Sequence, residues 1–301
     1  MSVRAASSPM LRTRPWVPYL YVAPAFALLA LVFAYPVVRV VDFSTRLIRG
    51  ASGPYVGSLN YQLVWEDPTF RDALKHSALL LLAVPVLTGL SIFFAVLLYE
   101  GARGWRVYRS VLFLPYILAV PIVGIVASYI FQLNGALNSI LRAVGLDGLA
   151  LDWLGSERLS LLTVGIVIVW REVGFGIIIF LARLLTMDDE QLEAARIDGA
   201  GWWSQLRYII IPELRGTIEF YIVVASITML AWVFAYVYTI TSGGPGTSST
   251  VLELYIYNQG LRNSLPGMAS AVAVVLLGAT LVGITLLMII RARAAQREEL
   301  A

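Results

Sequence analysis

Two adjacent charged residues, Arg171 and Glu172, interrupt a long run of apolar residues. A charge at the centre of a bilayer costs about 2.5 to 3.5 kcal/mol on insertion scales, so both side chains must face protein or water. Neighbouring residues on a helix point in different directions, and we therefore expect the two charges not to pair with each other and each to have a partner of its own. The chemistry that this pair offers is binding, since a guanidinium group can hold a phosphate, sulfate or carboxylate.

A second polar group is the segment 193–212, which lies between two long apolar runs. Asp188 can cap the start of a helix that Gly199 is expected to stop. A second short helix over 202–211 is then expected to end near Pro212. Small residues would let the backbone of another protein approach closely, which makes the segment a candidate docking element; they are Ala194, Ala195, Gly199, Ala200 and Gly201.

The composition excludes most catalytic chemistry. The chain has no cysteine and a single histidine, His76, which excludes a thiol nucleophile, a Cys-ligated zinc and a multi-His metal site. Lys75 is the only lysine. The four residues before it, 71–74, include no glycine, so a Walker-type phosphate loop is excluded too. The net charge of +3 sits in short loops and leaves no footprint for nucleic-acid binding. Any nucleotide chemistry must come from another subunit.

Membrane-spanning helices are the elements that must position these residues. Of the 301 residues, 59% are hydrophobic and 14% are charged, which leaves too little polar surface to cover a soluble globule. A helix needs about 20 apolar residues to span a bilayer. Six runs meet this requirement, approximately 18–41, 74–99, 110–131, 159–185, 217–241 and 268–290. We expect an all-α membrane protein with kinks at Pro115 and Pro121 in the third span.

Basic residues are distributed unequally between the two sides of the membrane. With the N-terminus inside, 13 Lys and Arg residues lie in inner segments and 8 in outer ones, with Arg171 within a span. Cytoplasmic loops carry the excess of basic residues, so both termini are expected in the cytoplasm. No outer loop is long enough for a core of its own. The predicted organisation is a cytoplasmic segment (1–17), one transmembrane domain (18–290) with a polar loop at about 186–216, and a cytoplasmic tail (291–301).

The spacing within the polar loop resembles a known signature. Glu193-Ala194-Ala195, then Gly199 after three residues and Ile209-Ile210-Ile211-Pro212 after nine more, resembles the signature of inner-membrane permease subunits of binding-protein-dependent ABC importers. The departure is Ile211, where that family usually has leucine. In such permeases this loop docks in a groove of the ATPase subunit. The resemblance therefore implies that the ATPase-coupling residues are Glu193, Ala194, Ala195, Asp198, Gly199 and Pro212.

Other segments resemble the carbohydrate-uptake branch, the permeases similar to those for maltose and glycerol 3-phosphate. Among them are Pro18-Tyr19-Leu20, Gly135-Ala136-Leu137-Asn138 and Gly267-Met268-Ala269-Ser270-Ala271, although Ala235 stands where an Asp is common. The resemblance covers nearly the whole chain. It implies a second permease subunit, two ATPase subunits that bind ATP and magnesium, and an extracytoplasmic solute-binding protein as partners. It also implies the plasma (inner) membrane of a bacterium or archaeon, and no cofactor in this chain.

The resemblance also implies a solute path through the fourth and fifth spans. Trp170 matches a tryptophan in the segment that lines the sugar site of maltose-type permeases, whereas Arg171 and Glu172 depart from that pattern. An aromatic ring can stack on a pyranose while a few polar groups bind its hydroxyls. Two interpretations of the charged pair stay open: contact with an anionic solute, or a buried ion-pair network with a second permease. The path residues are Trp170, Arg171, Glu172, Phe175, Met229, Trp232 and Val233.

An ion-coupled secondary transporter, which works without an ATPase, is the alternative function. Such a carrier should show inverted repeats with interrupted helices in matching halves, and the sequence shows no convincing internal repeat. A membrane enzyme would need a nucleophile, a metal set or an acid/base pair, which Arg171 and Glu172 alone do not supply. The sequence favours a transport subunit rather than an enzyme, and within that class the permease of an ATP-driven importer of a sugar or sugar-like solute.

Overall fold

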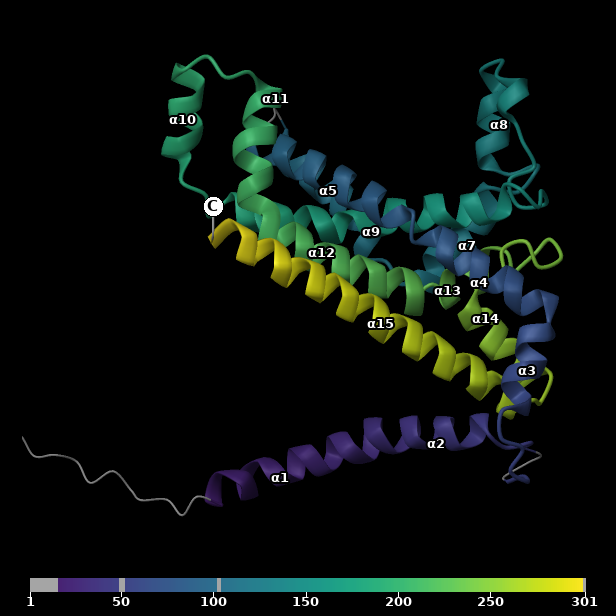
Figure 1. Ribbon diagram of the computed structural model, residues 1–301. Coiled ribbons are helices and arrows are strands. Elements are labelled where there is room, and N and C mark those ends of the chain that lie inside the picture. Colours follow the sequence, from purple (N-terminus) through teal and green to yellow (C-terminus); the bar gives the residue numbers. More distant parts are fainter. Residues whose placement is uncertain (1–15, 49–51, 102–103, 300–301) are drawn as a thin grey trace, which may run out of the picture.

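The computed structural model describes residues 16–48, 52–101 and 104–299, which form helices joined by turns. The predicted N-terminal segment therefore lies almost wholly outside the described residues. The long helices run between two ends of the molecule, with α10 and α11 at one end and α3, α8 and α14 at the other (Figure 1). The elements are α1 (Val17–Leu29), the π-helix η1 (Ala30–Ala34), α2 (Tyr35–Ser44), α3 (Leu59–Glu66), α4 (Pro68–Leu80), α5 (Ala83–Tyr99), α6 (Trp105–Ile117), α7 (Val120–Ile130), α8 (Ala136–Ala143), the 3-10 helix η2 (Asp147–Leu149), α9 (Ser160–Leu184), α10 (Asp189–Ile197), α11 (Trp202–Gln205), the π-helix η3 (Leu206–Ile210), α12 (Ile211–Ala231), α13 (Phe234–Ile240), α14 (Leu252–Tyr257), the π-helix η4 (Asn258–Arg262) and α15 (Pro266–Glu299).

Six spans can be assigned by length and composition. Five helical segments of the described chain are long and apolar enough to cross a membrane, namely Tyr19–Ser44, Pro68–Tyr99, Ser160–Leu184, Trp202–Ala231 and Pro266–Leu286. The sixth is a bent pair of helices, Val107–Ile117 and Val120–Ile130, counted as one span. The expected all-α membrane fold with about six spans is confirmed. The last helix, α15, continues beyond the predicted limit at 290 and ends at Glu299.

The third span is broken rather than kinked, which corrects the sequence prediction. Its two helices, α6 and α7, meet at an angle of 101°. Leu118 and Ala119 between them are extended, with ψ of 141° and 135°. Pro121 then falls in the first turn of α7, where its missing N–H removes no helical hydrogen bond. The carbonyl groups at the end of α6 consequently lack helical partners and need other donors.

The segment around Pro212 and the fifth span also differ from the prediction. The helix expected to end near Pro212 continues, because in the π-helix η3 the N–H of Ile211 bonds to the carbonyl of Leu206, five residues back, and α12 follows directly. A π turn displaces the backbone where a proline would otherwise disturb the helix. The predicted fifth span, 217–241, is in turn divided, because α12 ends at Ala231 and α13 begins at Phe234.

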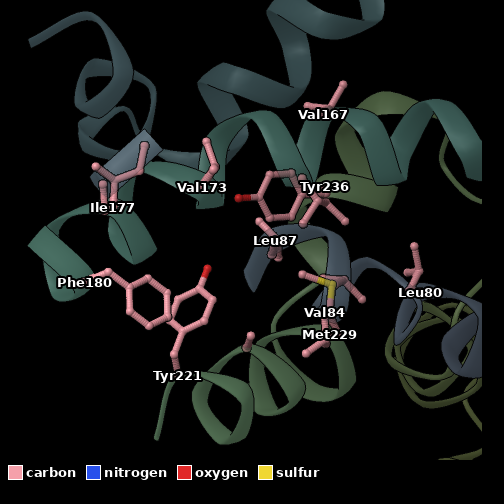
Figure 2. Packing of buried hydrophobic residues seen from close by; sticks show 14 of the residues in the cluster. Leu80, Val84, Leu87, Val167, Val173, Ile177, Phe180, Tyr221, Met229 and Tyr236 are labelled. Carbon is pink, nitrogen blue, oxygen red and sulfur yellow. The ribbon is translucent and has the colours of Figure 1, made fainter. Parts of the chain in front are cut away.

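The main core lies between α5, α9, α12 and α13. Leu87, Phe180, Tyr221, Met229 and Tyr236 are among its most deeply buried side chains. Figure 2 shows them converging from these four helices. The first span takes no part in this core. None of the side chains in its most apolar stretch is buried, and Figure 1 shows α1 and α2 running apart from the other helices until the C-terminal end of α2.

Close helix packing in this core depends on Gly176, and substitution there should destabilise the fold. A Cβ at position 176 would collide with Oγ of Ser91 and lie 2.7 Å from Cζ of Tyr221. At Gly165 of the same helix, the nearest atom would be Cδ2 of Leu80, at an ordinary 3.8 Å. We expect Gly176→Ala to lower the free energy of unfolding by about 1–3 kcal/mol through overpacking.

The matched variant Gly165→Ala should be neutral or stabilising, because alanine favours helix over glycine by about 1 kcal/mol. Thermal unfolding midpoints of the two purified variants in detergent measure the difference. Equal midpoints for the two variants would contradict this account of the packing between α5, α9 and α12.

Candidate functional site

The polar loop forms a helix and a tight glycine turn that project from one end of the molecule. Asp188 caps α10 as predicted, since its side chain accepts a hydrogen bond from the N–H of Glu190 at 3.1 Å. Gly199 ends the helix in the left-handed conformation, with φ of +81°. The N–H groups of Gly199 and Ala200 donate to the carbonyls of Arg196 and Ala195 at 3.1 and 2.9 Å. The turn therefore fixes both the end of α10 and the direction of α11.

Most predicted coupling residues lie on the exposed surface of this loop. Glu193, Ala194, Asp198, Gly199 and Pro212 are exposed and Ala195 is partly buried. A single apolar residue of α10, Leu192, is buried and holds the helix against the core. Ile197, at the end of α10, is 86% exposed. A surface of small, acidic and apolar side chains on an otherwise polar helix is a surface that a protein partner can cover.

An ion pair joins the two ends of the polar loop. A guanidinium nitrogen of Arg183, at the end of α9, donates to the carboxylate of Glu213, in the first turn of α12, and another donates to Oγ1 of Thr186 at 2.9 Å. The side chains of both charged residues are more than a third exposed, so water weakens their attraction. The pair keeps the start of the loop next to its end.

Arg171 and Glu172 form one polar network at the break in the third span. Nη1 of Arg171 lies 2.5 Å from Oε1 of Glu172, and both side chains are only 13% exposed. Nε and Nη2 of Arg171 donate to the carbonyl of Leu118 at 3.2 and 2.9 Å. Tyr236 of α13 donates to Oε1 of Glu172 at 2.6 Å and lies 3.2 Å from Nη1 of Arg171. The guanidinium also lies 5.1 Å from the centre of the Tyr116 ring.

This geometry corrects the expectation that the two charges would not pair with each other. The long arginine side chain reaches both its neighbour and the broken end of α6. Each charge also has a further partner, the Leu118 carbonyl for Arg171 and the Tyr236 hydroxyl for Glu172. A cation at the C-terminal end of a helix satisfies its free carbonyl groups and complements the helix dipole. The network therefore holds α6, α9 and α13 together at the break.

The structure brings only some of the predicted path residues together. Glu172, Phe175 and Met229 line one crevice of about 10 Å³, which is room for one water molecule and not for a sugar. Trp170 lines two apolar grooves of about 810 and 320 Å³ on the outside of the helices. Trp232 is 71% exposed, and Val233 is buried. The single chain therefore offers aromatic walls and a polar network, but no enclosed pocket among these residues.

Three groups near the breaks in the third and fifth spans were not predicted from the sequence. Nothing in the sequence distinguishes Tyr236 from a packing residue, although a tyrosine that is fully buried needs a partner for its hydroxyl. The carbonyl of Leu118 is a backbone atom and leaves no trace in the sequence. Glu253 donates no hydrogen bond to this network but accepts one from the N–H of Val233 at 3.0 Å, at the break in the fifth span. It is an isolated acidic residue in an apolar stretch, which is a signal that could have drawn attention to it.

Within the described residues, no group of three or more His, Asp or Glu side chains is placed to hold a metal ion. The polar network is a set of paired charges and hydrogen bonds that connects three helices. Its charges are paired and its aromatic neighbours are packed. The ring of Phe175, for example, stacks on the ring of Tyr116, with ring centres 5.3 Å apart.

Comparison with known proteins identifies the family. Residues 13–298 match the family described as binding-protein-dependent transport system inner membrane component. The chain is 34% identical to the probable ABC transporter permease protein YurN of Bacillus subtilis (strain 168), over 88% of this chain and 92% of that protein. It is 32% identical to the lactose transport system permease protein LacF of Rhizobium radiobacter, over 81% of this chain and 83% of that protein.

A solved structure shares the fold. A chain in the crystal structure of a bacterial ABC transporter involved in the import of the acidic polysaccharide alginate superposes with a TM-score of 0.81, at 22% identity and over 93% of this chain and 96% of that chain. With a family match from residue 13 to residue 298, this chain belongs to the inner membrane components of binding-protein-dependent transport systems, the permease subunits of ABC importers.

Proposed function

We propose that this chain is the permease subunit of an ATP-driven importer that takes a sugar or sugar-like solute from an extracytoplasmic binding protein. The exposed helix α10 is the observation that carries the proposal. A membrane protein that has no Walker-type phosphate loop and projects an ordered, capped helix beyond its spans has an element for another protein to hold. That other protein is an ATPase subunit, and the coupling surface is the set Glu193, Ala194, Ala195, Asp198, Gly199 and Pro212.

The sidedness follows from the same assignment. In Figure 1, the first residues of α1 and the last residues of α15 lie on the same side of the molecule as α10. An ATPase works in the cytoplasm, so an α10 that meets one puts both ends of the chain there as well. The opposite end, with α3, α8 and α14, then faces the binding protein. This agrees with the excess of basic residues that the sequence has on the inner side.

A second permease subunit is the proposed partner within the membrane. The first span leaves its apolar side chains uncovered, and an apolar groove of about 810 Å³ runs along α5, α6 and α9. The predicted path residues Trp170 and Trp232 are both more than half exposed on the single chain. A solute path lined by these residues needs a second wall, which another permease supplies.

The proposed cargo is a carbohydrate-like solute. The relative LacF is named for lactose, a neutral sugar, and the importer that shares the fold is described for the acidic polysaccharide alginate. Trp170 offers a ring that a pyranose can stack against. Arg171 is engaged by Leu118, Glu172 and Tyr236, which favours the structural interpretation of this charge over direct contact with an anionic solute.

Energy coupling separates this proposal from the secondary transporter. In vesicles that contain this chain, the second permease and the ATPase, with the binding protein outside, uptake should require ATP inside and continue when a protonophore collapses the ion gradient. The measurement is uptake of radiolabelled sugars retained by that binding protein. Uptake that stops with the protonophore and ignores ATP would establish the secondary carrier instead.

A further inference from the structure

A carboxylate from another helix lies at the break in the fifth span. The N–H of Val233 donates to Oε2 of Glu253 at 3.0 Å, and Val233 is the residue immediately before α13. Where a helix is interrupted, the N–H groups that follow the break lack a carbonyl four residues earlier and need another acceptor. Glu253 belongs to the first turn of α14, which follows α13 after a turn-rich connection. The break is therefore held from outside the span.

Glu253 occupies an unfavourable place for a charge. It is partly buried, and burial raises the pKa of its carboxyl to about 7, although the N–H groups of Val233 and Phe234 act in the opposite direction. An apolar residue of similar size would avoid this desolvation, but it would leave the N–H of Val233 without its acceptor. The hydrogen bond to the break is therefore the reason for an acid at position 253.

The helix that Glu253 holds also carries a member of the polar network. Tyr236 lies in the first turn of α13 and donates to Glu172 of α9, whose neighbour Arg171 binds the carbonyl of Leu118 at the other break. Figure 2 shows the Tyr236 ring beside the part of α9 that carries Val173. A continuous set of hydrogen bonds and covalent links thus runs from Glu253 through α13 to the break between α6 and α7. Both interrupted spans are joined by it.

The opposite side of α14 is fixed to the beginning of the second span. The hydroxyl of Tyr255 donates to Oδ2 of Asp67 at 2.6 Å, and the N–H of Leu252 donates to Oγ of Ser77 at 3.0 Å. These contacts hold α14 against α4 at the end of the molecule opposite α10 (Figure 1). A displacement of α14 would therefore move Glu253 relative to the start of α13.

We propose that Glu253 is a positioning residue that fixes the start of α13 against α14, and so links the end of the molecule farthest from α10 to the Arg171 network at the broken third span. Glu253 acts through Val233, from whose N–H it accepts a hydrogen bond, and through Tyr236 on the helix that Val233 precedes. The inference rests on the proposed function, since the movement it transmits belongs to the ATP-driven cycle. It adds to that function a route by which a displacement of α14 at one end of the molecule reaches the Arg171 network.

Glu253→Met and Glu253→Gln test this role in the complete transporter. Methionine keeps the volume and removes the acceptor, whereas glutamine keeps an acceptor oxygen for the N–H of Val233. The chain has no cysteine, so Trp232→Cys provides a single reporter beside the break, at a position that is 71% exposed in the isolated chain. The readout is the rate at which a charged maleimide alkylates this cysteine, without nucleotide and with a nonhydrolysable ATP analogue.

With Glu253 present, nucleotide should change the alkylation rate by about fivefold or more. Glu253→Met should abolish this change, because the N–H of Val233 loses its acceptor, and Glu253→Gln should retain it. Glu66→Met, at an exposed acid of α3 at the same end of the molecule, is the matched control and should behave as the parent. A nucleotide response in Glu253→Met equal to that of the parent, or no response in the parent itself, would overturn the proposal. Failure of the chain to associate with any ATPase would instead overturn the proposed function.

Discussion

Replacing Gly199 by valine is expected to abolish ATP-driven uptake while the protein still reaches the membrane in normal amounts. Gly199 has φ of +81°, a conformation that costs an L-residue about 1–2 kcal/mol and that β-branched residues rarely adopt. The strain falls on the turn that sets α10 against α11, so α10 should be misdirected without disturbing the spans. The measurements are uptake, the amount of protein in the membrane, and co-purification with the ATPase.

Two further variants identify the cause of the loss. Apart from its neighbours in sequence, a Cβ at position 199 meets no atom of the described residues within 4 Å, so a clash with them does not explain a defect. Asparagine tolerates the left-handed conformation but still adds a side chain. Partial uptake in Gly199→Asn would point to backbone strain, and complete loss would point to a partner that approaches too closely for any side chain.

Gly278→Ala is the matched control, because Gly278 lies within α15, away from the polar loop, and a Cβ there would have open space around it. It should keep normal uptake and normal association with the ATPase. Normal uptake in Gly199→Val would contradict the assignment of this loop to coupling.

The polar loop could be predicted in detail because its structure is determined locally. The cap at Asp188 and the stop at Gly199 follow from the preferences of single residues, and the structure has both. The end predicted near Pro212 was wrong because the π-helix before it carries the chain past the proline. A π turn depends on the displacement of one hydrogen bond, and no residue type in the sequence specifies it.

The polar network could be predicted only in part. That Arg171 and Glu172 are buried within the protein follows from the cost of placing charges in lipid, and their side chains are 13% exposed. Their partners depend on how distant segments meet. The carbonyl of Leu118 is available only because the third span breaks there, and Glu253 reaches the fifth span only because α14 folds back beside it. Such contacts are properties of the packed helices and not of any local pattern.

Loss of Arg171 is expected to impair the transporter equally for neutral and anionic sugars. Arg171→Ala removes the guanidinium nitrogens that donate to the carbonyl of Leu118, and it leaves the carboxylate of Glu172 without its cation. Both charged side chains are only 13% exposed. Removing one partner of a buried pair costs about 3–5 kcal/mol, since the other charge stays buried. We expect a lower thermal midpoint and a loss of uptake in the same proportion for both kinds of sugar. Arg158→Ala, at an exposed arginine just before the same helix, should have little effect on either.

The double variant Arg171→Met, Glu172→Met distinguishes a structural pair from a solute ligand. If the pair is structural, removing Glu172 as well eliminates the uncompensated charge, so the double variant should be more stable than Arg171→Met alone by about 1–3 kcal/mol. Tyr236→Phe should cost about 1 kcal/mol, because it removes the hydroxyl that joins α13 to the pair. A selective loss of anionic sugar uptake in Arg171→Ala, with an unchanged thermal midpoint, would show instead that the guanidinium binds the solute. The distinction matters for the whole site, because a structural Arg171 leaves Trp170 and a partner permease to select the cargo.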